Sequence, residues 1–84
     1  MHEMSLLNPV IAKVTQLARE HAAVRVAAVD LTIGALAGIE PDHLRDHWVN
    51  AVPGTVASGA ELRVRVSGDP FSRGVTVDSV ELET

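Results

Sequence analysis

The spacing of the hydrophobic residues changes period along the chain, and this change restricts the fold more than any other feature. Residues 60–66, Ala-Glu-Leu-Arg-Val-Arg-Val, alternate polar and apolar side chains without interruption. Such alternation predicts a β-strand with one buried face, because successive side chains point to opposite sides of a strand. Residues 5–22 and 40–52 instead repeat their apolar side chains at helical spacing, which predicts two amphipathic helices.

Two further segments predict strands. Residues 24–33 are rich in β-branched side chains and alternate toward their end. Near the start of this segment, Val24 and Val26 fall on the opposite parity to the later apolar residues. This change predicts either a bulge at Ala27-Ala28 or a strand start that is covered on both faces. Residues 75–83 also alternate, with a change of parity near Asp78. Pro9 is expected to delay the first regular helix to between Ser5 and Asn8, which leaves residues 1–4 as an arm.

The order of elements is thus helix, strand, helix, strand, strand, and it predicts an α+β fold. We expect a two-layer sandwich in which both helices pack on one face of a small three-stranded mixed sheet. The second strand should lie parallel to the first across a right-handed crossover, and the last two strands should form a hairpin. Leu44, Trp48 and Val52 recur at helical spacing, which places Trp48 in the core. A chain of 84 residues leaves room for one domain, residues 1–84.

Composition argues against several classes of function. The chain contains no cysteine, which excludes disulfides, thiolate-bound zinc, iron–sulfur clusters and thiol catalysis. A net charge of -4 argues against nucleic-acid binding. No apolar run approaches the roughly 20 residues that span a bilayer, and no basic leader precedes the first helix, so we expect a cytoplasmic protein without membrane contact. No acid–base pair, catalytic triad or phosphate-binding loop is visible, so we expect no enzymatic activity.

Met1, His2 and Glu3 form a candidate metal site. The α-amine, the His2 amide nitrogen and the His2 imidazole can close adjacent chelate rings on one ion, and the Glu3 amide can supply a fourth nitrogen. Four nitrogens suit square-planar Ni(II) or Cu(II). The amine titrates near about pH 8 and the imidazole near about pH 6.5, so metal affinity should fall on acidification. The competing interpretation is an N-terminus that binds no metal.

A second group of metal-ligating residue types lies on the second predicted helix. Glu40, His43 and His47 share one helix face, and His43 with His47 have a spacing that can chelate one ion. The alternative is a solvated polar face, which we favour because Asp42, Arg45 and Asp46 are close in sequence. His21, on the apolar side near the end of the first helix, is interpreted as a packing or capping residue.

Several segments together resemble one family of metal-binding accessory proteins. They are Met1-His2-Glu3-Met4-Ser5-Leu6, Val29-Asp30-Leu31-Thr32-Ile33-Gly34-Ala35-Leu36, Glu40-Pro41, Gly54-Thr55 and Gly59-Ala60-Glu61-Leu62. In this order and spacing they resemble the HypA/HybF family of nickel metallochaperones, which serve NiFe-hydrogenase maturation and, in some organisms, urease.

The resemblance implies a ligand set and a set of partners. It implies that Ni(II) is held by the Met1 amine, His2 and the Glu3 backbone, together with an acidic residue that falls at Glu40. It also implies transfer of the ion to a hydrogenase large subunit, together with a HypB-like GTPase. For Glu40, a carboxylate favoured by the start of a helix is a second reading that is compatible with the first.

The sequence departs from the family in one place. Family members usually carry a cysteine-rich zinc module between the second and third strands, whereas this chain has only the short turn at 67–74. We therefore expect a single nickel-binding domain and no zinc. Two other functions stay open: a protein-interaction module that keeps the fold without delivering metal, and storage or delivery of another metal through His43 and His47. An edge strand in so small a sheet could also pair between copies of the chain.

Overall fold

The computed structural model describes residues 3–84, and within them the predicted order of elements is confirmed. The elements are α1 (Glu3–Glu20), β1 (Arg25–Ile33), α2 (Pro41–Ala51), β2 (Glu61–Val66) and β3 (Val75–Glu83). One prediction is wrong at its edge: α1 already includes Glu3 and Met4, which were expected in an arm. Pro9 lies inside the helix, where its missing N–H removes only one hydrogen bond close to the start. Met1 and His2, the rest of the expected arm, lie outside the described residues.

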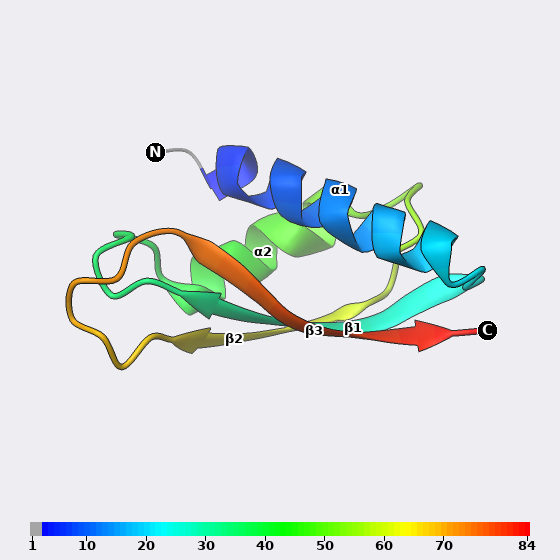
Figure 1. Cartoon of the computed structure of the whole chain (residues 1–84). Helices are drawn as coiled ribbons and strands as arrows, with labels where there is room; N and C mark the ends of the chain where they lie inside the picture. Colours follow the sequence, from blue (N-terminus) through cyan, green and yellow to red (C-terminus); the bar gives the residue numbers. More distant parts are fainter. Residues whose placement is uncertain (1–2) are drawn as a thin grey trace.

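The three strands form one mixed sheet with β1 in the centre. The strand order is β2-β1-β3, with β2 parallel and β3 antiparallel to β1 (Figure 1). The β1–β3 register shifts between Val26 and Ala28 and again between Asp30 and Leu31. The first shift confirms the bulge alternative at Ala27-Ala28, and the second explains the change of parity near Asp78.

The predicted hairpin between the last two strands is wrong. After β2 the chain crosses the end of β1, where the Ser67 amide donates to the Ile33 carbonyl and the Gly34 amide donates to the Gly74 carbonyl, both at 2.8 Å. β3 then pairs with the free edge of β1. A physical reason is the burial of β1, in which five of nine residues are buried. Backbone groups of so buried a strand need hydrogen-bond partners on both edges, which a central position provides. With nine residues, β3 also matches the length of β1.

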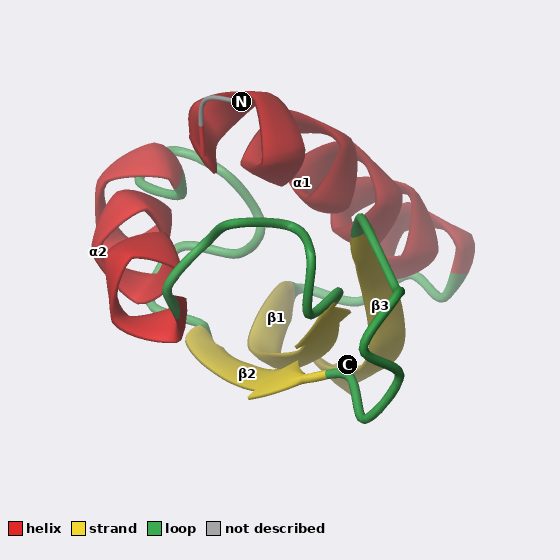
Figure 2. Cartoon of the chain, turned by 90° about the vertical axis from the view of Figure 1, so that its left-hand side faces the viewer, coloured by secondary structure: helices red, strands yellow, loops and turns green. Residues whose placement is uncertain are grey.

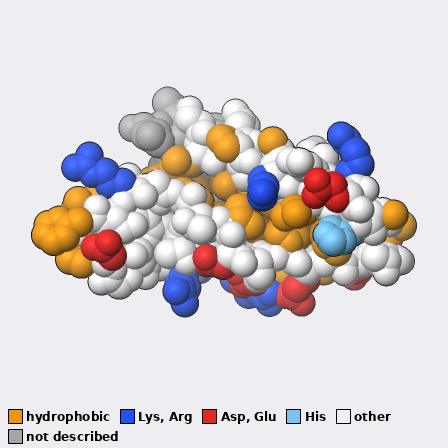
Figure 3. All heavy atoms as spheres, in the orientation of Figure 1, with side chains coloured by type: hydrophobic (Ala, Val, Ile, Leu, Met, Phe, Trp, Pro, Cys, Tyr) orange, Lys and Arg blue, Asp and Glu red, His pale blue; other side chains and the backbone are white. Residues whose placement is uncertain are grey.

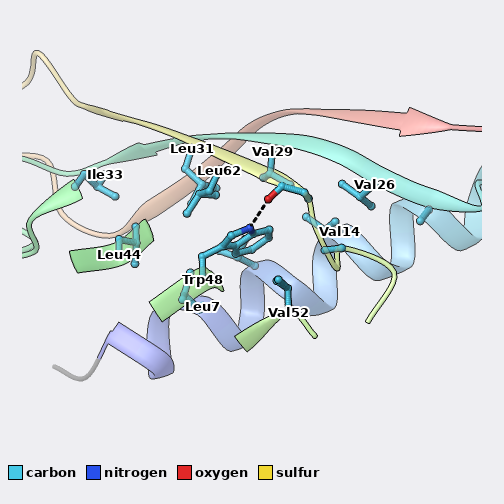
Figure 4. Close-up of a cluster of buried hydrophobic side chains, with 14 residues drawn as sticks. Leu7, Val14, Val26, Val29, Leu31, Ile33, Leu44, Trp48, Val52 and Leu62 are labelled. Atoms are coloured by element: carbon cyan, nitrogen blue, oxygen red, sulfur yellow. Dashed lines mark hydrogen bonds between the residues drawn. The ribbon is translucent and has the colours of Figure 1, made fainter. Parts of the chain in front are cut away.

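Both helices cover the same face of the sheet, as the two-layer prediction requires (Figure 2). The buried residues between helices and sheet are mainly Val, Leu, Ile and Ala, with Trp48 the largest of them. The Trp48 side chain is 1% exposed, and its indole N–H donates to the Ala60 carbonyl at 3.0 Å (Figure 4). This bond links α2 to the start of β2 and satisfies the polar atom of a buried indole. The prediction that Trp48 belongs to the core is confirmed.

The end of α1 shows how the chain turns back toward the sheet. The Ala23 amide donates to the Ala18 carbonyl at 2.8 Å, the Ala22 amide donates to the Arg19 carbonyl, and Ala22 has φ 52°. This is the Schellman arrangement that ends many helices. His21 lies at the cap position and its side chain is exposed, so of its two expected roles, packing or capping, its place in the fold agrees with capping and not with packing.

The face of the sheet opposite the helices carries a polar network centred on Arg63. Its guanidinium donates to both carboxylate oxygens of Asp30, at 2.7 and 3.1 Å, and also pairs with Glu81. The Ser79 hydroxyl donates to Asp30 as well. The hydrogen bonds from Arg63 and then from Ser79 hold the pKa of Asp30 below its ordinary value of 3.8. One arginine thus connects all three strands on this face.

Candidate metal centre

Of the three predicted N-terminal ligands, only Glu3 belongs to the part of the chain that the structure describes. Met1 and His2 are outside the described residues, and Glu3 is the first residue of the helix. The amide of a first helical residue has no acceptor within its own helix, because the i−4 carbonyl lies before the helix begins. The Glu3 amide nitrogen can therefore bind a metal ion without breaking a helical hydrogen bond. This local geometry suits the donor set that the sequence suggests.

Glu40 occupies the N-cap position of α2. Its backbone is extended, with φ -84° and ψ 132°, and its side chain makes no capping hydrogen bond. The Glu40 carbonyl accepts from the Leu44 amide at 3.1 Å, so the backbone starts the helix and the exposed carboxylate is not required for it. Figure 1 shows that α1 and α2 both begin at the same end of the molecule. Glu40 is thus on the same end as Glu3, and its carboxylate is available to a ligand there.

His43 and His47 lie one turn apart on α2, next to the buried Leu44 and Trp48. The His43 side chain is exposed and the His47 side chain is half-buried. Within residues 3–84, no group of three or more His, Asp or Glu side chains is placed to hold a metal ion. Glu40, His43 and His47 therefore do not make a three-ligand site of their own, and a metal bound at this end needs donors from elsewhere.

A match to a family model shows to which protein family the chain belongs. Residues 1–69 match the family model described as "Hydrogenase/urease nickel incorporation, metallochaperone, hypA". The chain belongs to the HypA family. The resemblance of the N-terminal, strand-exit and second-helix segments is thereby confirmed at the level of the family.

Individual relatives agree with this membership. The chain is 47% identical over 64 residues to the hydrogenase maturation factor HypA of Chlorobium limicola, covering 76% of this chain and 55% of the relative. It is 41% identical over 75 residues to that of Prosthecochloris aestuarii, covering 89% of this chain and 64% of the relative. The chain thus spans little more than half to under two thirds of the length of these curated relatives.

A solved structure supports the fold of this HypA-family chain. The solution structure of the nickel metallochaperone HypA from Helicobacter pylori matches with a TM-score of 0.82 and 13% identity, covering 99% of this chain and 98% of that one. At this identity the likeness concerns the fold alone. It includes β3, which lies beyond the residues that the family model matches.

Two features of the surface were not predicted from the sequence. The alternation of residues 60–66 puts Arg63 on the polar face of its strand, but its pairing with Asp30 depends on the parallel register that sets the two residues side by side. The available signal was parity, because Asp30 and Arg63 each lie on the polar face of their strand. The second feature is a groove between α1 and β3, which are far apart in sequence and meet only in the fold.

Proposed function

We propose that this chain binds Ni(II) at its N-terminus and supplies the ion for NiFe-hydrogenase maturation. The observation that carries the proposal is the family match, which begins at residue 1 and includes the proposed ligands. Met1 contributes its α-amine, His2 its imidazole and amide nitrogen, and Glu3 its amide nitrogen. Glu40 supplies a carboxylate from the start of α2. Nickel is the cargo in this scheme, and the protein catalyses no reaction.

The proposed donor set has consequences for metal choice and pH. Nitrogen donors in a plane favour Ni(II) and Cu(II) over ions that prefer oxygen. The amine and the imidazole must be deprotonated to bind a metal ion. A backbone amide nitrogen binds only in its deprotonated form, and the metal ion promotes loss of that proton. Affinity should therefore fall as the pH drops below about 8 and then below about 6.5. The position of the Glu3 amide at the start of α1 supports the scheme, since the helix does not use that N–H.

The proposal extends to the organisation of the chain and to its partners. Residues 1–84 act as one nickel-binding domain, with the loop at 67–74 in the place of a zinc module and no zinc bound. A HypB-like GTPase and a hydrogenase large subunit are the proposed partners. The short connection supports this organisation, because it leads from β2 directly across the end of β1 into β3. Neither helix within residues 3–84 has the length and apolar character that a membrane span requires.

Calorimetric titration of Ni(II) tests the proposed ligands. The experiment compares wild type with an authentic Met1, His2→Ala, and the matched control His21→Ala, which removes an exposed histidine from the opposite end of α1. We expect His2→Ala to abolish high-affinity binding and His21→Ala to leave it unchanged. An N-terminal extension, which turns the α-amine into an amide, should act like His2→Ala. Equal Ni(II) affinities for wild type and His2→Ala would overturn the assignment.

The second candidate function is a protein-interaction module that does not deliver metal. The short 67–74 connection between β2 and β3 favours it, because a larger module is not inserted there. Binding of the purified HypB-like GTPase distinguishes the two functions. If the GTPase binds equally well after the His2→Ala substitution and in the presence of a chelator, the result supports the interaction module. If either treatment abolishes GTPase binding, the result supports nickel delivery. A third alternative is storage or delivery of another metal through His43 and His47. The double variant His43→Ala/His47→Ala tests it, since only this alternative predicts that the variant loses metal binding.

A further inference from the structure

A groove runs between α1 and the beginning of β3. Leu6, Pro9 and Val10 line it on the α1 side, and Val75 and Val77 line it on the β3 side. Its volume is about 380 Å³. Figure 3 shows hydrophobic side chains exposed along this face, between the helix and the strand. The groove is therefore an apolar channel that the fold leaves open.

A second hollow continues this channel past the beginning of β3. It has a volume of about 210 Å³ and shares Leu6 with the first. Its other lining residues are Leu36, Ala37, Arg73 and Gly74. Gly74 directly precedes Val75, so the two hollows follow the same stretch of chain. Together they form what we call the α1–β3 groove.

The floor of the α1–β3 groove is β3, an edge strand whose outer backbone N–H and C=O groups can pair with a further strand. No strand pairs with the outer edge of β3 within the described sheet. The Gly34 amide donates to the Gly74 carbonyl, and Val75 and Val77 stand opposite Ile33 and Leu31. The alternation of an antiparallel ladder then turns the N–H and C=O groups of Val75 and Val77 away from β1. The same two residues thus offer side chains to the groove and backbone groups to a further strand.

The charged side chains that line the groove within residues 5–84 are all positive. Lys13 and Arg73 are the only charged side chains that line it among residues 5–84, and they stand in different hollows, toward its two ends. Neither forms an ion pair in that part of the chain. The chain as a whole has a net charge of -4. An apolar channel between two cations fits an apolar segment that carries carboxylates at both ends.

A second copy of this chain is a poor occupant for electrostatic reasons. The strand that a second copy could add is its own β3, which is preceded by Arg73, so it would bring a cation rather than a carboxylate to one end of the groove. Like charges on neighbouring strands are destabilising. The occupant should therefore come from a different chain.

We propose that the α1–β3 groove binds an extended segment of a partner protein, which adds to β3 as a fourth strand. The segment places apolar side chains at alternate positions into the groove and carboxylates at its two ends toward Lys13 and Arg73. Its backbone pairs with Val75 and Val77, in the manner of other peptides that extend a sheet edge. This interaction does not involve the proposed nickel ligands, so it can be tested on metal-free protein.

A synthetic peptide with this pattern tests the proposal. The probe is fluorescein-labelled Glu-Thr-Val-Thr-Val-Thr-Glu, and the control is Lys-Thr-Val-Thr-Val-Thr-Lys, both titrated with chelator-treated protein. We expect saturable binding of the acidic peptide with a Kd of about 1 mM or tighter, the weak end of peptide recognition. Amide chemical shifts should change at Val75 and Val77 more than on β2, the opposite edge of the sheet. No saturable binding, or shifts centred on β2, would overturn the proposal.

Charge reversals provide the matched variants. Lys13→Glu and Arg73→Glu should each weaken binding of the acidic peptide by about three- to tenfold, and the double variant should prefer the lysine peptide. Arg19→Glu, on an exposed position of α1 that does not line the groove, should have no effect. Equal effects of Lys13→Glu and Arg19→Glu contradict the proposal. Self-association of wild type that the double variant abolishes would instead show that the groove joins two copies of this chain.

Discussion

The two faces of the sheet are stabilised by different interactions, and neighbouring residues of β1 show the contrast. Leu31 and Ile33 point toward the helices and are each 1% exposed, whereas Asp30 and Thr32 lie on the opposite face and are partly exposed. The first face gains stability from burial of apolar area. The second gains hydrogen bonds and ion pairs that compete with water. We expect the helix-covered face to determine how stable the chain is, and the open face to determine how stability responds to pH and salt.

The largest expected effect comes from a pair of adjacent substitutions on β1. Leu31→Ala should lower the free energy of unfolding by about 2–5 kcal/mol, because it leaves a cavity between sheet and helices. Thr32→Ala removes only a hydroxyl that bonds Arg65 and Asp78 on the open face, so it should cost less than about 1 kcal/mol. Urea unfolding followed by the fluorescence of Trp48, the single tryptophan, measures both. Similar losses for the two variants would show that the two faces do not differ as described.

A smaller effect is expected where β1 ends and backbone packs directly against backbone. A Cβ at Gly34 would lie 2.5 Å from the Ser72 carbonyl oxygen and 2.6 Å from the Arg73 nitrogen. Gly34→Ala should therefore push the 67–74 loop away and cost about 1–3 kcal/mol. Gly68→Ala is the matched control in the same loop, since nothing lies within 4 Å of its added Cβ.

The control should leave stability unchanged or raise it by up to about 1 kcal/mol, because alanine restricts the unfolded chain more than glycine does. Chemical denaturation of the two glycine variants gives the comparison. If Gly34→Ala is as stable as Gly68→Ala, the loop does not hold the end of β1.

The elements could be predicted from the sequence because each depends on local periodicity. The alternation of residues 60–66 and the helical spacing of Leu44, Trp48 and Val52 require no knowledge of the rest of the chain. The changes of parity near Ala27-Ala28 and near Asp78 could be read for the same reason, whereas the choice between a bulge and a strand start covered on both faces needed the structure. The hairpin prediction failed because strand order is decided by which edge of β1 remains open, and that depends on packing between distant segments.

For the functional sites too, some features can be predicted from local sequence and others depend on the fold. The donor chemistry of Met1, His2 and Glu3 can be read from three consecutive residues, and it stays a prediction. The predicted helix over residues 40–52 has Glu40 at its start, and this position is confirmed. The α1–β3 groove could not be predicted, because its walls come from residues about 65 positions apart whose contact depends on the sheet order.

The smallest expected effect on stability lies in the pH response of the open face. The pKa of Asp30 is held below its ordinary value of 3.8, chiefly by the hydrogen bonds from Arg63. Arg63→Gln should raise the Asp30 pKa toward that ordinary value. Arg65→Gln, on the same strand and face, donates to Thr32 rather than to Asp30 and should leave it unchanged. Carboxyl ¹³C chemical shifts across an acid titration measure each pKa.

The direction of the stability change follows from the direction of the pKa shift. A carboxyl whose pKa is lower in the folded state than in the unfolded state stabilises the fold when the pH is above the unfolded value, about 3.9. That contribution disappears as the pH falls through the lower, folded value. The difference in stability between wild type and Arg63→Gln should therefore be present at pH 7 and shrink in acid, and it should also decrease in high salt. A difference that stays constant down to pH 2 would mean that Arg63 acts by packing its aliphatic stem on the sheet, and the open face would then resemble the covered one.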